Sequence, residues 1–249
     1  CGAGASSITT GTNITVSDGN ASGGFWYGAH ENNEVEPGMA IGQAWDLEGF
    51  FLDNTSLFMV GGFDFVNGYS GIRSGDIFID VDMDARYGDI HGSSDGNVTT
   101  NNSNGYDFVL DMDFASQTYN LFKIVEQTRV VTSYYKQNQG SNPWRYDSGA
   151  HFLGAGFFSY NPEFVVKEAN SFFHDNQDHN VVMVDLGLFM ELTGMDGEML
   201  FHFTMGCGND NLMGRGFLPV PNPEPGAMVL LGFGLLGLAG LGRKTINKK

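Results

Sequence analysis

Apolar and polar side chains alternate along much of this chain, and Gly, Asn, Asp and Ser separate the alternating stretches. A period of two places successive side chains on opposite faces, which is typical of half-buried β-strands. Short strands between polar turns favour antiparallel pairing. We therefore predict an all-β body, an antiparallel β-sandwich or jelly roll. The clearest candidate strands are residues 75–85, 106–114, 118–125, 181–186 and 200–205.

Composition indicates a folded and strongly acidic protein. Of the 249 residues, 41% are hydrophobic and 13% are aromatic, which is enough to bury a core. The chain has 29 acidic residues against 12 Lys and Arg, so its formal net charge is -17. Because phosphate contacts need Lys and Arg, this balance argues against a nucleic-acid partner.

The character of the chain changes near its C-terminus. Residues 226–242 contain no charged side chain, and four basic residues follow them. As a helix this stretch would be about 25 Å long, slightly less than the roughly 30 Å hydrocarbon core of a bilayer. Because basic flanks stay cytoplasmic, a spanning helix would leave the acidic body outside the membrane. A buried core helix is the alternative. We expect three segments: a β body at 1–218, a proline-rich motif at 219–225, and a transmembrane helix with a basic tail at 226–249.

The two cysteines, Cys1 and Cys207, suffice for one disulfide bridge. The chain begins at Cys1 without an initiator Met, from which we expect a removed leader and export. Exported chains meet oxidising conditions, so we predict a bridge between the two cysteines. A cysteine at the first mature position also fits lipoprotein cleavage, and this alternative remains open.

Pro223, Glu224 and Pro225, the hydrophobic stretch and the basic tail follow one another in an order that resembles a PEP-CTERM sorting domain. The resemblance implies an exported bacterial protein that passes transiently through the inner membrane and is recognised by exosortase, a membrane transpeptidase. Residues 204–214, TMGCGNDNLMG, are similar to a Cys-Gly-Asn-Asp segment common upstream of this signal. The resemblance implies where the protein is sorted, and it implies no activity for the β body.

Acidic residues recur with the strand period in two neighbouring stretches. Carboxylates with one parity on a strand share a face and repel one another. A hard cation with six to eight oxygen ligands would relieve that repulsion, so we expect a calcium site; a solvated acidic face is the alternative. The pattern is not an EF-hand, because Ala85 and His91 replace its required Gly and Glu. The candidate ligands are Asp76, Asp80, Asp82, Asp84, Asp107, Asp111 and Asp113.

No coherent catalytic set is visible in the sequence. Residues 92–96 fit GxSxG, but loop composition follows where a nucleophile elbow needs a helix. We therefore expect a non-enzymatic structural protein of the cell surface or extracellular (biofilm) matrix, calcium-stabilised and self-assembling into filaments, which binds exopolysaccharide or copies of itself. The rival hypothesis is a secreted carbohydrate-binding module or a hydrolase that acts on exopolysaccharide with paired carboxylates.

Overall fold

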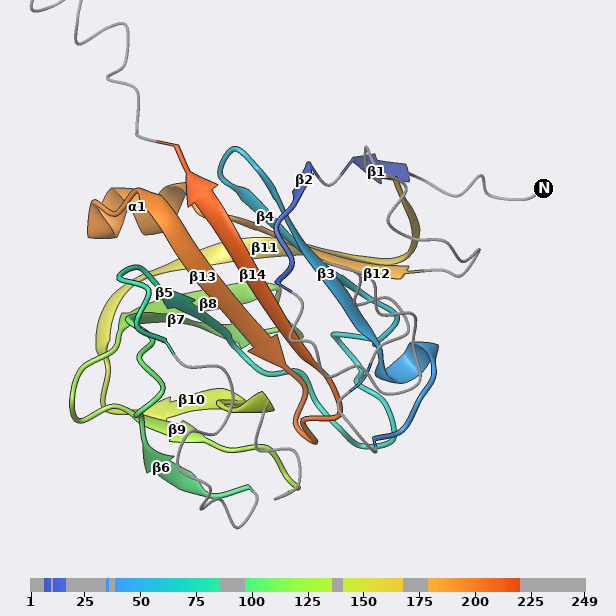
Figure 1. Ribbon diagram of the computed structural model, residues 1–249, viewed down its shortest axis with the longest axis horizontal. Helices are drawn as coiled ribbons and strands as arrows, with labels where there is room; N and C mark the ends of the chain where they lie inside the picture. Colours follow the sequence, from blue (N-terminus) through green and yellow to red (C-terminus); the bar gives the residue numbers. More distant parts are fainter. Residues whose placement is uncertain are drawn as a thin grey trace, which may run out of the picture. The chain divides into compact units, whose positions relative to one another are not determined.

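The computed structural model describes residues 7–9, 11–16, 35, 39–85, 97–135, 141–167 and 179–219 (Figure 1). Contacts divide the chain into two units, residues 1–219 and 220–249, and the fold below is that of the first. Three predictions lie outside the described residues: the motif Pro223-Glu224-Pro225, the helix at 226–249, and Cys1. Within the described part, no helix is long and apolar enough to cross a membrane.

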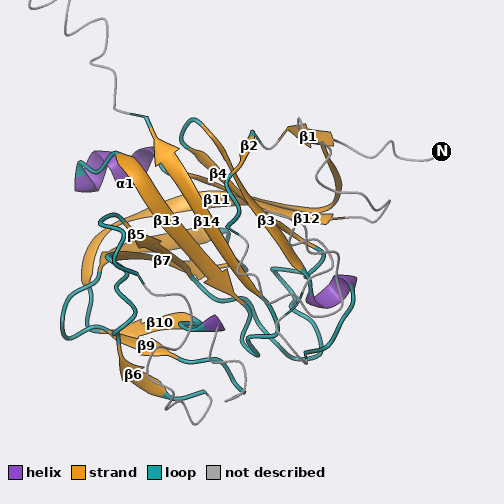
Figure 2. Cartoon of the chain, viewed as in Figure 1, coloured by secondary structure: helices purple, strands orange, loops and turns teal. Residues whose placement is uncertain are grey.

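The described residues are mostly β-strand, with one short α-helix, α1 (Gly187–Thr193), and one 3-10 turn, η1 (Gln43–Trp45) (Figure 2). The strands are β1 (Ser7–Thr9), β2 (Thr12–Asn13), β3 (Leu47–Asp53), β4 (Ser56–Gly61), β5 (Ile77–Asp80), β6 (Thr99–Asn101), β7 (Phe108–Asp113), β8 (Thr118–Lys123), β9 (Arg129–Val131), β10 (Arg145–Ser148), β11 (His151–Lys167), β12 (His179–Asp185), β13 (Gly197–Thr204) and β14 (Asn211–Leu218).

Most of these strands join one large sheet in the order β14-β13-β5-β7-β8-β11-β12-β4-β3-β2. Neighbours along this path are antiparallel, and β1 pairs in parallel with the far end of β11. A separate small sheet has the order β10-β9-β6. The long strand β11 pairs with β8 through its first half and with β12 through its second half, so it joins the two sides of the large sheet.

The large sheet curls until its two ends meet along residues 12–16. On one side Ile14 N donates to Phe50 O of β3 at 2.9 Å. On the other side Val16 N donates to Met213 O at 2.8 Å, and Arg215 N of β14 donates to Ile14 O at 2.7 Å. The segment therefore lies between β3 and β14 and closes the sheet (Figure 1).

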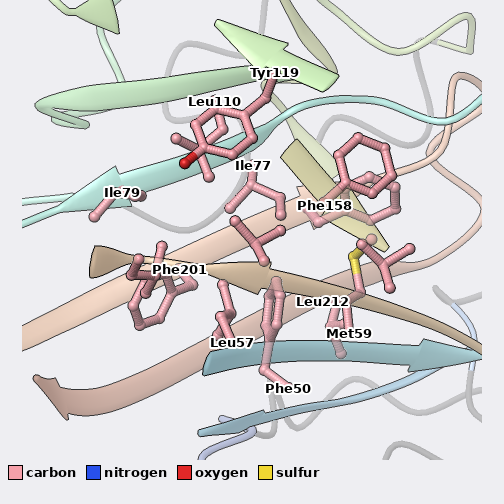
Figure 3. Packing of buried hydrophobic residues seen from close by; sticks show 14 of the residues in the cluster. Phe50, Leu57, Met59, Ile77, Ile79, Leu110, Tyr119, Phe158, Phe201 and Leu212 are labelled. Atoms are coloured by element: carbon pink, nitrogen blue, oxygen red, sulfur yellow. The ribbon is translucent and has the colours of Figure 1, made fainter. Parts of the chain in front are cut away.

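The space enclosed by the curled sheet is filled by the main hydrophobic core. Figure 3 shows Phe50, Met59, Ile77, Phe201 and Leu212, from five different strands, pointing toward one another. The helix α1 adds Phe189, whose ring lies 5.2 Å from that of Phe108 in an edge-to-face contact. Each fully buried side chain of this size contributes about 1.5–3 kcal/mol. Burial inside the curl is thus what holds distant strands in one sheet.

The small sheet packs against the outer face of the large one. A second buried cluster forms there from Phe78 of β5, Val109 of β7 and Val130 of β9, with Tyr106 beside them. The predicted mostly antiparallel β body is therefore confirmed. The architecture differs from the expected sandwich or jelly roll, because one curled sheet encloses most of the core and only a three-stranded sheet faces it.

Candidate metal centre

Strand β5 ends at Asp80 because the carboxylate of this residue binds the backbone that follows. Its Oδ1 accepts hydrogen bonds from Asp82 N at 3.0 Å and Met83 N at 2.9 Å, and its Oδ2 accepts one from Ala85 N at 2.9 Å. Local side-chain acceptors of this kind compete with ladder pairing. The chain therefore wraps around Asp80 instead of continuing as a strand.

This turn brings Asp80, Asp82 and Asp84 together, with a carboxylate oxygen of each within 4.8 Å of the others. Asp80 is buried, whereas Asp82 and Asp84 are exposed. Calcium binds oxygen at about 2.3–2.6 Å, so two ligands of one ion lie at most about 5 Å apart. The three carboxylates fit that limit, and the site is open to solvent on one side.

Asp107, immediately before β7, lies next to this cluster. Its Oδ2 accepts a hydrogen bond from Val81 N at 2.9 Å, and its own N–H donates to Ile79 O. Burial raises the pKa of Asp107, and the negative charges of Asp82, Asp80 and Asp84 raise it further. A bound cation would oppose this repulsion. We refer to Asp80, Asp82, Asp84 and Asp107 as the acidic loop cluster.

The backbone around the cluster is closely packed at Gly105. This residue has a φ of 86°, in the left-handed region that favours glycine. A Cβ at this position would lie 2.5 Å from Asp84 Oδ1 and 2.8 Å from Ala85 Cα. Glycine is therefore what allows the segment before β7 to lie against the acidic loop.

Asp76 occupies a different place, at the start of β5. It is buried, and its two oxygens accept hydrogen bonds from Met112 N of β7 at 2.9 Å and Tyr146 N of β10 at 2.7 Å. Burial raises the pKa of Asp76 to about 8, and the nearby charge of Asp111 adds to the effect. This carboxyl group links the large sheet to the small one.

Asp111 and Asp113 are also separated from the acidic loop cluster. Asp111 is half-buried beside Asn120, and burial raises its pKa. Asp113 accepts hydrogen bonds from Ala115 N and Ser116 N in the turn after β7. Residues 107 and 113 lie about 20 Å apart along a strand. The seven predicted ligands therefore divide into three carboxylates close enough to share an ion, Asp107 beside them, and three carboxylates with other local roles.

The Cys-Gly-Asn-Asp segment forms the turn between β13 and β14. Asn209 binds both main-chain groups of Ala40: its Oδ1 accepts from Ala40 N at 3.0 Å, and its Nδ2 donates to Ala40 O at 2.9 Å. Asp210 accepts a hydrogen bond from Leu47 N at the start of β3. These buried side chains fix the chain that leads into β3. The sequence resemblance identified this segment but did not indicate its structural role.

Cys207 lies in the same turn. It is buried, and burial raises the pKa of its thiol to about 11. Since Cys1 lies outside the described residues, the predicted bridge between them stays a prediction.

A nearby buried contact between a glutamate and a histidine was not expected from the sequence. Glu48 Oε2 lies 2.8 Å from His179 Nε2, and Gln43 donates to Glu48 Oε1 at 2.7 Å. Both members of the pair are at most 3% exposed, and they join the start of β3 to the start of β12. Single charges far apart in the sequence carry no pattern that would have revealed this contact.

Together the fold and the cluster define an acidic, mostly β protein with a carboxylate loop that could hold a cation. Residues 223–244 match the PEP-CTERM protein-sorting motif, in agreement with the resemblance noted above. The motif implies an exported protein that is processed by exosortase and sorted to the cell surface. No curated protein and no solved structure matches the chain.

Proposed function

We propose that this protein is a non-enzymatic structural component of the cell surface or extracellular matrix, and that calcium bound at the acidic loop cluster stabilises its β body. The observation that carries the proposal is the convergence of Asp80, Asp82 and Asp84 within 4.8 Å, with Asp107 beside them. The sorting motif supplies the location at which such a body would act.

Calcium suits the cluster better than a smaller or softer ion. All four candidate ligands are carboxylates, which are hard oxygen donors. Magnesium demands an octahedral shell at about 2.0–2.1 Å. The open side of the cluster, next to the exposed Asp82 and Asp84, leaves room for the water ligands of a calcium ion.

The position of Asp76, whose carboxyl group has a strongly raised pKa, supports a non-enzymatic role. A paired-carboxylate hydrolase needs one raised-pKa acid free to reach its substrate. Asp76 has a raised pKa, but both of its oxygens accept backbone hydrogen bonds and the side chain is buried. Its contacts hold two sheets together, so they account for the group without catalysis.

The exposed carboxylates also offer a route to assembly. Asp82 and Asp84 face solvent, and a calcium ion held partly by them could take further oxygen ligands from a second copy or from an anionic exopolysaccharide. Surface assembly would then depend on divalent ions. Light scattering during calcium addition and chelation measures this dependence, and it should be absent from an Asp82→Asn, Asp84→Asn double variant.

The decisive experiment is thermal unfolding with calcium and with chelator at constant ionic strength, since salt alone screens exposed carboxylates. Binding to the native state alone stabilises by about 2.7 kcal/mol at a hundredfold excess over Kd. Asp82→Asn should abolish the calcium-dependent shift in Tm. Asp113→Asn is the matched control, because it removes the same charge from another exposed turn and should leave the shift intact.

Equal melting temperatures with calcium and chelator would refute the calcium site. A shift that is lost equally in the Asp113→Asn variant would mean that the ion acts through overall charge and not through the acidic loop cluster.

A further inference from the structure

The position between β3 and β14 that residues 12–16 occupy is shaped for a strand. A Cβ on Gly49 of β3 would lie 3.1 Å from Thr15 Oγ1, and a Cβ on Gly216 of β14 would lie 3.0 Å from Ile14 Cδ1. Glycines on both neighbouring strands thus make room for the side chains of the inserted segment. We refer to this position as the closing slot.

The closing slot needs an occupant. Residues 12–16 make main-chain hydrogen bonds on both sides: Ile14 N donates to Phe50 O of β3, Val16 N donates to Met213 O of β14, and Ile14 O accepts from Arg215 N of β14. If the segment left, two facing strand edges would lose these partners. Exposed strand edges bind further strands readily. The slot would then take up an equivalent strand from another source.

Beside the inserted segment is an open surface groove of about 400 Å³, lined by Thr12, Ile14, Leu52, Asn54, the exposed Phe217 and Pro219. The inserted segment can therefore be reached from solvent at this end of the closing slot.

The inserted segment lies in a stretch of the chain that carries no charged side chain. Copies of a chain with net charge -17 repel one another. Residues 1–17 contain no charged side chain, and the first is Asp18. The same sequence in a second copy has the same complementarity to the closing slot.

We propose that the closing slot accepts residues 11–16 of a second copy, so that neighbouring copies assemble by exchanging their closing strands. The inference deepens the proposed role as an assembling surface protein and rests on it, but it requires no calcium. Exchange re-forms the main-chain hydrogen bonds of residues 12–16 to β3 and β14 with another copy's Ile14 and Thr15 in place. It requires β1, which ends just upstream at Thr9 and pairs with β11, to move with the segment.

The test uses two full-length variants in detergent, one with a defective strand and one with a defective slot. Ile14→Asp places a charge where Ile14 packs against the core, and Gly216→Val fills the space that Ile14 needs. The slot of the first variant and the strand of the second remain intact. We expect each variant alone to be monomeric and an equimolar mixture to form one-to-one dimers, measured by light scattering and by native mass spectrometry.

A labelled peptide of residues 11–16 decides the question if either variant fails to fold. The peptide should bind the full-length wild-type protein, and the Ile14→Asp peptide should bind at least about tenfold more weakly. Absence of mixed dimers between folded variants, or equal binding of the two peptides, would overturn strand exchange.

The dimer and peptide-binding measurements are made in chelator, which separates strand exchange from the calcium site. Mixed dimers without a calcium-dependent Tm shift would leave strand exchange standing and remove the calcium site. A calcium-dependent shift without mixed dimers would do the reverse.

Discussion

Thr15 and Phe50 exchange two hydrogen bonds where the sheet closes. Thr15 Oγ1 accepts from Phe50 N at 3.0 Å and donates to Phe50 O at 3.2 Å. Thr15 is only 7% exposed. The Thr15 hydroxyl group therefore supplies the acceptor for Phe50 N, whereas Phe50 O also accepts a hydrogen bond from Ile14 N.

Thr15→Val should lower the free energy of unfolding by about 1–3 kcal/mol, because it leaves the buried Phe50 N–H without its acceptor while keeping the side-chain shape. Thr12→Val is the control: Thr12 is exposed, and the change should be within about 0.5 kcal/mol. Urea denaturation of both variants measures the difference. A Thr15→Val variant as stable as wild type would show that the hydroxyl group does not hold the closure.

Asn209→Ala should loosen the chain before β3. Both hydrogen bonds to Ala40 are lost, and we expect a loss of about 1–3 kcal/mol in the free energy of unfolding. Limited proteolysis should cut first near residues 39–46. Asn101→Ala, which removes an exposed amide that contacts Arg129, should change neither quantity appreciably. Unchanged cleavage in the Asn209→Ala variant would show that the two hydrogen bonds between Asn209 and Ala40 do not hold this segment in place.

Asp76 should make the protein less stable as the pH rises from 6.5 to 8. Its pKa is raised from 3.8 to about 8 in the folded state, so the folded protein holds a proton that the unfolded chain has lost. That contribution is complete below pH 4 and disappears as the pH passes 8, with a slope of at most about 1.4 kcal/mol per pH unit.

Below pH 6.5 a second group opposes this trend. Burial lowers the pKa of His202 to about 4, so the unfolded chain binds a proton there that the folded state does not. This contribution is lost as the pH falls from 6.5 to 4. Asp76→Asn should therefore flatten the decline between pH 6.5 and 8, measured as Tm against pH, and should steepen the loss of stability as the pH falls from 6.5 to 4, because the opposing contribution of Asp76 is gone. Parallel curves for wild type and variant would exclude Asp76 as the cause.

A Cys1–Cys207 bridge predicts that intact mass after denaturation in alkylating agent shows no added label without reductant and two labels with it. Such a bridge closes a loop of more than two hundred residues, worth roughly 5 kcal/mol in the chain-entropy account. Two labels without reductant, or a diacylglycerol mass on Cys1, would disprove the bridge.

Exosortase processing predicts a new C-terminus near Pro225 on protein recovered from the medium. The sorting motif begins at Pro223, and the hydrophobic stretch after it would otherwise remain in the inner membrane. Peptide mass spectrometry identifies the end. Intact Lys249 on most secreted molecules would contradict removal of the tail.

Local sequence patterns predicted the positions of the strands more accurately than the order in which the strands pair in the sheet. The alternation at 106–114 and 118–125 predicted β7 and β8, which pair with one another as a hairpin. Nothing local places β5 between β7 and β13, or residues 12–16 between β3 and β14, because partner choice depends on burial of side chains far apart in the chain. The sequence therefore predicted mostly antiparallel strands but not one curled sheet.

The candidate site was predicted only in part, again because a local sequence pattern does not determine which residues meet in the fold. Same-parity spacing suggested one acidic strand face from Asp76 to Asp84. The strand ends at Asp80, since that carboxylate accepts hydrogen bonds from three backbone N–H groups among the next five residues, and Asp82 and Asp84 lie close to it through a turn. Asp76 and Asp80 sit at opposite ends of β5 and meet different neighbours. Parity alone could not distinguish these outcomes.

The antiparallel pairing of β13 with β14 has a mechanical consequence for a tethered protein. The sorting segment follows β14 directly, so tension on an attached C-terminus enters the body at Leu218 and runs along that strand. Eight residue pairs join β14 to β13, and residues 14–16 bind its other edge. A pull along the strand loads these hydrogen bonds together, in shear, and does not open them one after another. Such a load is therefore shared by all of these hydrogen bonds at once.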